Sequence, residues 1–212
     1  MSGRADRAAL HLAADYPCLG ALAAQRADRV VLRNYEWTAH LQVAAQIAED
    51  LTSFALSFSP HDNRFRSFIA SMHNTGPTQS WHELAWQILE DLPTFDLSPW
   101  PPYAPRDPKH PDFRFCFASR QWFVVMLSSG SSRRSRQLLM NGLAFNPSHI
   151  FDSLRARGLY EPLATSIRQR DRAYSGSSYR SPQTYPSLGD APQYSGEEYT
   201  PDWRCPVSFN HK

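Results

Sequence analysis

Residues 113–127, FRFCFASRQWFVVML, decide the fold class of this 212-residue chain. From 113 to 117 phenylalanine alternates with smaller or charged residues, which is the period of two expected of a strand. From 122 to 127 every residue is apolar, which predicts a strand whose two faces are both covered. Because only the short segment 119–121 provides a turn, the two runs are expected to pair as an antiparallel hairpin.

The rest of the chain mixes strand and helix patterns without regular alternation. Further strands are expected at 30–32, 65–71 and 143–145. Apolar stripes with breaks at their ends predict helices at 4–14, 36–58, 81–92, 147–158 and 162–174. Asn146 is the expected N-cap of the helix that begins at 147 and Gly158 its end, while Ser80 or Thr78 caps the helix at 81. A turn is expected at 74–77.

These patterns predict an α+β fold made of a single domain, residues 1–212. Its core is a mostly antiparallel sheet of about four to five strands covered by helices. Seven prolines between 93 and 111 predict a long loop, packed through Trp100 and Tyr103. From about residue 176 the sequence is rich in Ser, Tyr, Pro and Gly and has no period, so an irregular tail is expected.

Composition excludes several classes of function. The net charge of +2 is too small to indicate nucleic-acid binding. No run of about eighteen apolar residues occurs, so we expect no membrane span, and we expect no secretion signal. Cys18, Cys116 and Cys205 are odd in number and widely spaced, which does not suit a disulfide framework. We therefore expect a cytoplasmic protein with reduced thiols.

Three arginines close a loop rich in serine and glycine, residues 128–136, which reads SSGSSRRSR. The backbone N–H groups of such a loop can face an anion, and guanidinium groups bind carboxylate or phosphate through two hydrogen bonds at once. Arg133, Arg134 and Arg136 are therefore candidates to bind haem propionates, a substrate carboxylate or a phosphate. A solvated basic loop is the alternative.

Two residues are candidate metal ligands. His149 is expected in the first turn of a helix, where the helix dipole disfavours imidazolium and so favours the neutral imidazole that a metal needs. Cys205 precedes a proline and could supply a thiolate, and Trp203 nearby could stack on a flat ring. The alternatives are a surface histidine and a free cysteine in a packed loop. Cys18 and Cys116 are interpreted as small core residues.

Several segments together resemble the YqcI/YcgG family. They are 16–20, 107–108, 113–117, 122–125, 132–136, 145–147 with Phe151 and 154–155, 167–171, 193–196 and 203–206. The last two segments resemble in particular a branch of haem-dependent N-hydroxylases, those of guanitoxin and D-cycloserine biosynthesis. The resemblance spans residues 16–209 and is strongest from Asp107 onward.

The resemblance implies a haem-dependent monooxygenase that hydroxylates an amine or guanidine nitrogen of a small amino-acid-like substrate in natural product biosynthesis. It implies haem b as the iron cofactor, dioxygen as co-substrate and an electron donor as partner; a homodimer is left open. His149 is the first choice of axial ligand and Cys205 the alternative. The cofactor would also contact Trp203 and the three arginines Arg133, Arg134 and Arg136.

The chain departs from the family pattern at three positions. Ser128 and Ser148 stand where relatives tend to have histidine, and Glu197 stands where they carry a basic residue. Apolar strand residues such as Phe123 and Val125 are expected to line a dry pocket. Two other functions stay open: a non-catalytic haem carrier or sensor, and a metal-free domain that binds an anionic small molecule through the arginine loop.

Overall fold

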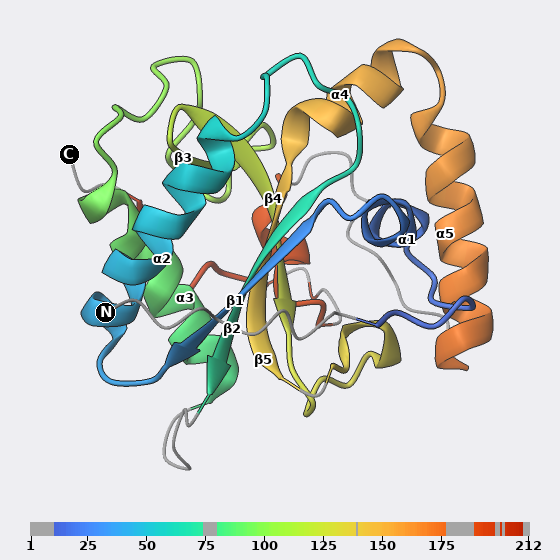
Figure 1. The fold of residues 1–212 in the computed structure, drawn as a ribbon, viewed down its shortest axis with the longest axis horizontal. Coiled ribbons are helices and arrows are strands. Elements are labelled where there is room, and N and C mark those ends of the chain that lie inside the picture. The colour runs from blue at the N-terminus through green and yellow to red at the C-terminus, as the bar shows by residue number, and fades with distance from the viewer. Residues whose placement is uncertain are drawn as a thin grey trace.

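The structure of the chain, a computed structural model, describes residues 11–73, 80–138, 140–176, 189–197, 200 and 202–209. Its centre is a five-stranded sheet in the order β1-β2-β5-β4-β3 (Figure 1). The strands are β1 (Val30–Glu36), β2 (Ser67–His73), β3 (Phe115–Phe117), β4 (Arg120–Leu127) and β5 (Asn141–Pro147). Every pair of neighbours is antiparallel except β1 with β2. The expected α+β fold, with its mostly antiparallel sheet, is confirmed.

The hairpin that decides the fold class is β3–β4. Phe117 pairs with Arg120, so only Ala118 and Ser119 form the turn. Both have positive φ, 51° and 56°, which is the type I′ geometry that matches the twist of paired strands. Strand β4 lies between β3 and β5, so both of its edges are paired. Trp122, Val124 and Met126 on one face are buried in the main core, whereas Phe123 and Val125 on the other face are partly buried, so the predicted cover of both faces is only partly confirmed.

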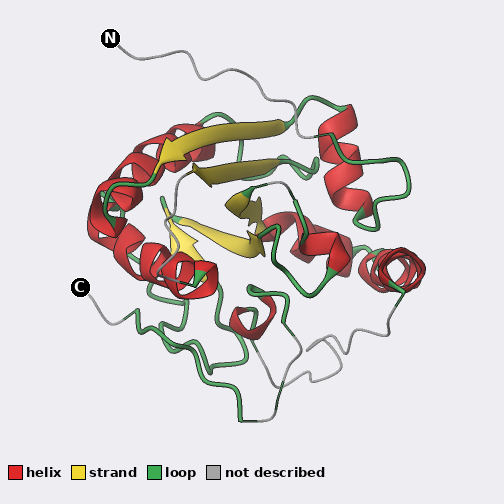
Figure 2. Ribbon diagram, turned by 90° about the horizontal axis from the view of Figure 1, so that it is seen from below, coloured by secondary structure: helices red, strands yellow, loops and turns green. Residues whose placement is uncertain are grey.

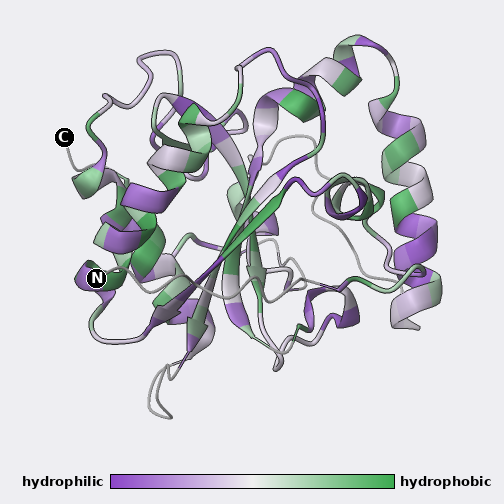
Figure 3. Cartoon of the chain, in the orientation of Figure 1, coloured by the Kyte–Doolittle hydropathy of each residue, from purple (hydrophilic) through white to green (hydrophobic). Residues whose placement is uncertain are grey.

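Helices cover both faces of the sheet (Figure 2). The helices are α1 (Leu19–Arg26), α2 (His40–Leu56), α3 (Trp81–Asp91), α4 (Ser148–Ala156) and α5 (Tyr160–Ser175). Helices α2 and α3 pack on one face and enclose the main core, to which the strands contribute Phe68, Val124 and Phe145. Helices α1, α4 and α5 lie over the other face (Figures 1 and 2). The strands are coloured mostly as hydrophobic, whereas α5 mixes both kinds of residue (Figure 3).

Five local expectations are wrong. The hairpin turn lies at 118–119 rather than at 119–121, and the strand before it begins at Phe115 rather than at 113. Residues 11–14 are not helical, and the first helix in the described chain is α1, which the sequence reading missed. Helix α2 begins at His40 rather than at 36, because β1 runs to Glu36. Asn146 is a residue of β5, and Pro147 is the N-cap of α4. Tyr103 is 75% exposed, so the proline-rich loop packs through Trp100 alone of the expected pair.

Other expectations fall partly or wholly outside the described residues. These are the N-terminal part of the helix at 4–14, the turn at 74–77, the Thr78 cap and most of the tail after 176. Within the described part of that tail, Ala191–Gln193 form a short 3₁₀ helix, and residues 189–196 pack beside β3 and β4. None of the described helices combines the length and the hydropathy that crossing a membrane would require.

Candidate functional site

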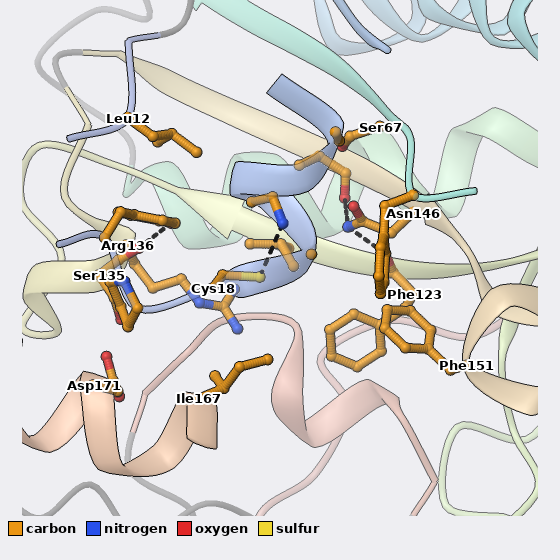
Figure 4. Close-up of a pocket in the computed structure, with 18 of the residues that line it drawn as sticks. Leu12, Cys18, Ser67, Phe123, Ser135, Arg136, Asn146, Phe151, Ile167 and Asp171 are labelled. Carbon is orange, nitrogen blue, oxygen red and sulfur yellow. Dashed lines mark hydrogen bonds between the residues drawn. The ribbon is translucent and has the colours of Figure 1, made fainter. Parts of the chain in front are cut away.

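A cavity of about 310 Å³ lies between the second face of the sheet and helices α1, α4 and α5. We call it the sheet cavity (Figure 4). Its sheet side is lined by Ile69, Phe123, Val125, Leu127, Ala144 and Asn146. Side chains of a strand alternate between faces, so Val124 and Met126 enter the main core while Phe123 and Val125 face the cavity. The sequence predicted this role for Phe123 and Val125.

On its helical side the sheet cavity is lined by one face of α5 and by α1, which packs closely against Phe65. Leu163, Ile167 and Asp171 follow one another at the spacing of one helical turn and all line the cavity. On α1, Gly20 lies against Phe65, and a Cβ added at position 20 would come within 2.9 Å of the phenylalanine ring. A glycine is therefore required at position 20 for α1 to pack at this distance.

Arg133 lies at one end of the sheet cavity and is paired with Asp171. Its Nε and Nη2 both donate to Asp171 Oδ2, at 3.0 and 2.5 Å. Asp171 is only 5% exposed, so this carboxylate needs the guanidinium to offset its loss of hydration. The positive charge at this end of the cavity is thereby partly neutralised by the protein itself.

Arg136 also lines the sheet cavity, and its guanidinium is committed to backbone carbonyls. Nη1 donates to the carbonyls of Tyr194 (3.1 Å) and Met126 (3.4 Å), and Nη2 donates to that of Gln193 (3.1 Å). The residue is 8% exposed. Arg136 therefore ties the C-terminal segment to β4 and to the arginine loop.

Arg134 points away from the cavity. Its Nη1 donates to the carbonyl of Tyr174, and its guanidinium lies 4.3 Å from the centre of the Tyr174 ring. Arg134 is exposed and does not line the sheet cavity. Of the three predicted arginines, the structure brings two to one cavity and places the third on the surface of α5.

Cys18 lines the sheet cavity, a position that the sequence reading did not assign to it (Figure 4). Its Sγ is the N-cap acceptor of α1 and receives the N–H of Ala21 at 3.4 Å. Burial raises the pKa of the Cys18 thiol, and the N–H groups of Ala21 and Gly20 together with Arg136 and Arg133 partly offset that rise. The one sequence feature that could have indicated a functional position for Cys18 is its place in segment 16–20, the first segment that resembles the family.

His149 does not line the sheet cavity. It is the second residue of α4, and its Nε2–H donates to the carbonyl of Asp62 at 3.0 Å. Its ring stacks on that of Phe58, with the ring centres 6.3 Å apart. Ligation of a metal through Nε2 would require this hydrogen bond to break.

Cys205 and Trp203 pack together against the main core, on the α3 side of the molecule. The ring centre of Trp203 is 6.4 Å from that of Trp86. Burial raises the pKa of the Cys205 thiol to about 11, so it is protonated at neutral pH. Neither residue lines the sheet cavity, so the structure does not bring the two predicted ligands and the arginines together at one site. The ligand roles of His149 and Cys205 stay predictions.

A second cavity, of about 660 Å³, adjoins the sheet cavity, and we call it the charged chamber. The two share Phe123, Phe151, Tyr160, Arg168 and Gln193 as walls. The chamber is also lined by Asp112, Arg114, Arg155, Glu161 and Asp190. Ser148, one of the two serines found where relatives tend to have histidine, lies buried at its wall, while Ser128 donates to Asn141 Oδ1.

Two carboxylates near Arg114 have opposite electrostatic environments: Asp190, which lines the charged chamber, and Asp152, which does not. Arg114 donates to both oxygens of Asp152, at 2.5 and 2.8 Å. Although burial raises it, these bonds hold the pKa of Asp152 below its ordinary value. Burial raises the pKa of Asp190 to about 6, and the charges of Arg114 and Arg155 only partly counteract this. Pairs of acids whose pKa values are driven apart are typical of functional sites.

Asp190→Asn is expected to stabilise the protein at neutral pH. Because the folded state holds the Asp190 proton more tightly than the unfolded chain, stability falls as pH rises from about 4 to about 6. At pH 7.5 the ionised carboxylate then costs about 1–3 kcal/mol, which the amide removes. Urea unfolding at pH 7.5 and pH 4 measures both values, and the gain should vanish at pH 4. Exposed Asp15→Asn is the control, and an equal gain at both pH values would contradict this account.

Arg136→Met is expected to lower the free energy of unfolding by about 2–4 kcal/mol, because it leaves buried carbonyls without donors. Arg134→Met is the matched control in the same loop. It removes one exposed hydrogen bond and a stacking contact, so it should cost less than about 1 kcal/mol. Chemical denaturation of both variants gives the comparison. Equal losses for the two arginines would show that Arg136 does not anchor the C-terminal segment.

Comparisons with known proteins agree with the family resemblance. The model of the YqcI/YcgG family matches residues 7–208. The chain is 23% identical over 167 residues to the uncharacterized protein YqcI of Bacillus subtilis (strain 168), which covers 75% of this chain and 65% of that protein. It is 30% identical over 87 residues to the "Putative N(omega)-hydroxy-L-arginine synthase DcsA" of Streptomyces lavendulae, which covers 40% of this chain and 33% of that protein. No solved structure matches.

The family match covers nearly all the chain, including the segments that form the sheet cavity. Among the described residues, no three His, Cys, Asp or Glu side chains are grouped to hold a metal ion. The partial likeness to the "Putative N(omega)-hydroxy-L-arginine synthase DcsA" agrees with the branch that the C-terminal segments resemble. The chain belongs to the YqcI/YcgG family.

Proposed function

We propose that this protein is an oxygenase that hydroxylates an amine or guanidine nitrogen of a small amino-acid-like substrate, with haem b as its cofactor. The partial similarity to the arginine N-hydroxylating synthase supports the reaction class. The observation that carries the proposal is the contiguity of two cavities. One is apolar and has a thiol and two arginines at its walls, and the other is charged.

The lining of the sheet cavity fits haem b in its chemistry. Ile69, Val125 and Ile167 give apolar walls for a flat ring. Arg133 and Arg136 also line the cavity, and an acidic edge would share Arg133 with Asp171 and Arg136 with the backbone carbonyls that it already bonds. Cys18 is a third candidate for the axial ligand, beside the predicted His149 and Cys205. Its sulfur already receives a backbone N–H, and such hydrogen bonds tune thiolate ligands of iron.

Haem b, when bound, supplies the activation of dioxygen. One oxygen atom enters the new N–O bond and the other leaves as water, with two electrons and two protons from an external donor. The protein's own contribution would be threefold. The apolar walls would exclude water, one of Cys18, His149 and Cys205 would hold the iron, and the charged chamber would orient the substrate. Coordination would also deprotonate the Cys18 thiol despite its raised pKa.

Haemin titration of the purified protein tests the cofactor. We expect a Soret band that saturates, and a ferrous–CO band at the long wavelength of a thiolate-ligated haem. Cys18→Ala should lose that long-wavelength band, whereas Cys205→Ala, whose thiol lies outside the sheet cavity, should keep it. His149→Ala tests the first ligand predicted from the sequence, and loss of the Soret band in this variant alone would assign the iron to His149.

A wild-type protein without a Soret band after haem supplementation would contradict the proposal. Mass spectrometry of amino acids incubated with the haem-loaded protein, dioxygen and a reductant tests the reaction itself. Haem binding without an N-hydroxylated product would favour the carrier or sensor. Stabilisation by phosphate without haem binding would favour the metal-free anion binder.

A further inference from the structure

The carboxylates in and beside the charged chamber differ in how many hydrogen bonds they accept. Asp152 accepts both terminal nitrogens of Arg114 and, at 3.1 Å, Nη1 of Arg155. The same guanidinium of Arg155 lies 4.1 Å from the ring centre of Tyr160. Asp152 is therefore a fixed structural partner, and its charge is balanced within the protein.

Asp190 lacks such a partner. Its side chain is 22% exposed, and the nearest cation is Nε of Arg114, at 3.9 Å from Oδ2. That distance is too long for a hydrogen bond, and the terminal nitrogens of Arg114 are already bound to Asp152. Among the described residues, no donor lies within hydrogen-bonding distance of the Asp190 carboxylate.

Hydrogen bonds and close packing hold the backbone around Asp190, which fixes the point from which its carboxylate enters the chamber. The N–H of Asp190 donates to the carbonyl of Phe113, and the N–H of Gln193 donates to the carbonyl of Asp190. Gly189 lies so close to His110 that an added Cβ would meet the His110 carbonyl at 2.5 Å. The chain thus presents to the chamber a carboxylate that is 22% exposed and whose one ion pair among the described residues is the 3.9 Å contact with Arg114.

The chamber also contains positive charge. Arg168 and Arg155 both line it, and their side chains are 44% and 45% exposed. Each already has a carboxylate of the protein beside it, Glu161 at 3.9 Å from Arg168 and Asp152 at 3.1 Å from Arg155, so a ligand carboxylate would share these guanidinium groups. A cavity with an anion on one wall and guanidinium groups on others matches a zwitterion better than a singly charged ion. The walls shared with the sheet cavity, among them Phe123 and Phe151, let a ligand occupy both spaces.

We propose that the charged chamber binds the head group of an α-amino acid, with Asp190 pairing with the ammonium and the arginines Arg155 and Arg168 facing the carboxylate. The side chain of the amino acid then crosses between the shared walls into the sheet cavity, which places its distal nitrogen there. This inference takes its substrate class from the proposed function. It adds Asp190 as the residue that positions and selects the substrate.

Calorimetric titration of the full-length protein with L-arginine and L-lysine tests the inference. The comparison ligand is 5-guanidinopentanoate, which is L-arginine without its α-ammonium. We expect an amino acid to bind, and Asp190→Asn to weaken it by about 10–100-fold through loss of one charge-assisted pair. The same variant should change the affinity for 5-guanidinopentanoate by less than about 2-fold. Glu83→Gln, on the exposed side of α3, is the matched control and should change neither affinity.

Two results would overturn the inference: equal loss of both ligands in Asp190→Asn, or no binding of either amino acid at millimolar concentration by the wild-type protein. Since Asn removes a destabilising charge, Asp190→Asn is expected to fold, and its melting temperature confirms this before the titration. These outcomes are distinct from failure of the proposed function. Haem could bind and the reaction proceed without dependence on Asp190, or amino acids could bind through Asp190 without any haem.

Discussion

The buried guanidinium of Arg136 holds together the parts of the molecule that make the site. It joins the arginine loop, strand β4 and the C-terminal segment through carbonyls that would otherwise be buried without donors. Two further bonds fasten the same segment, from Met126 N–H to the carbonyl of Tyr194 and from Phe115 N–H to the Tyr194 hydroxyl. Gln193 and Asp190 are thereby fixed at the junction of the two cavities. An arginine predicted to bind an external anion thus also has a structural role.

Much of the fold could be predicted because its deciding signals are local. The alternation at 113–117, the apolar run at 122–127 and the stripe of α3 depend only on neighbours along the chain. The run and the stripe are confirmed as β4 and α3, and the alternation is confirmed over Phe115–Phe117. The parallel pairing of β1 with β2 joins strands separated by α2, and no local pattern reveals it. Asn146 has the composition of an N-cap, yet it extends β5, because pairing with Phe123 outweighs its local preference.

The candidate site could be predicted only in part. Arg133 and Arg136 reach the sheet cavity, and Phe123 and Val125 line it as expected. Cys18 was taken for a core residue because a single cysteine carries no spacing signal, and only the packing of α1 against Phe65 brings it to the cavity. No sequence motif marks Asp190. Its raised pKa comes from burial, and it lies beside Phe113, which is 77 positions away in the sequence and close only after folding.

The central claim is that the sheet cavity is where the ligand of this protein binds. The chain offers an internal comparison, because Cys18 lines that cavity while Cys205 packs elsewhere, against the main core. The most direct measurement is mass spectrometry of cysteine alkylation with and without haemin. The account predicts that haemin protects Cys18 and leaves the labelling rate of Cys205 unchanged. Protection of Cys205 with Cys18 still labelled would contradict it.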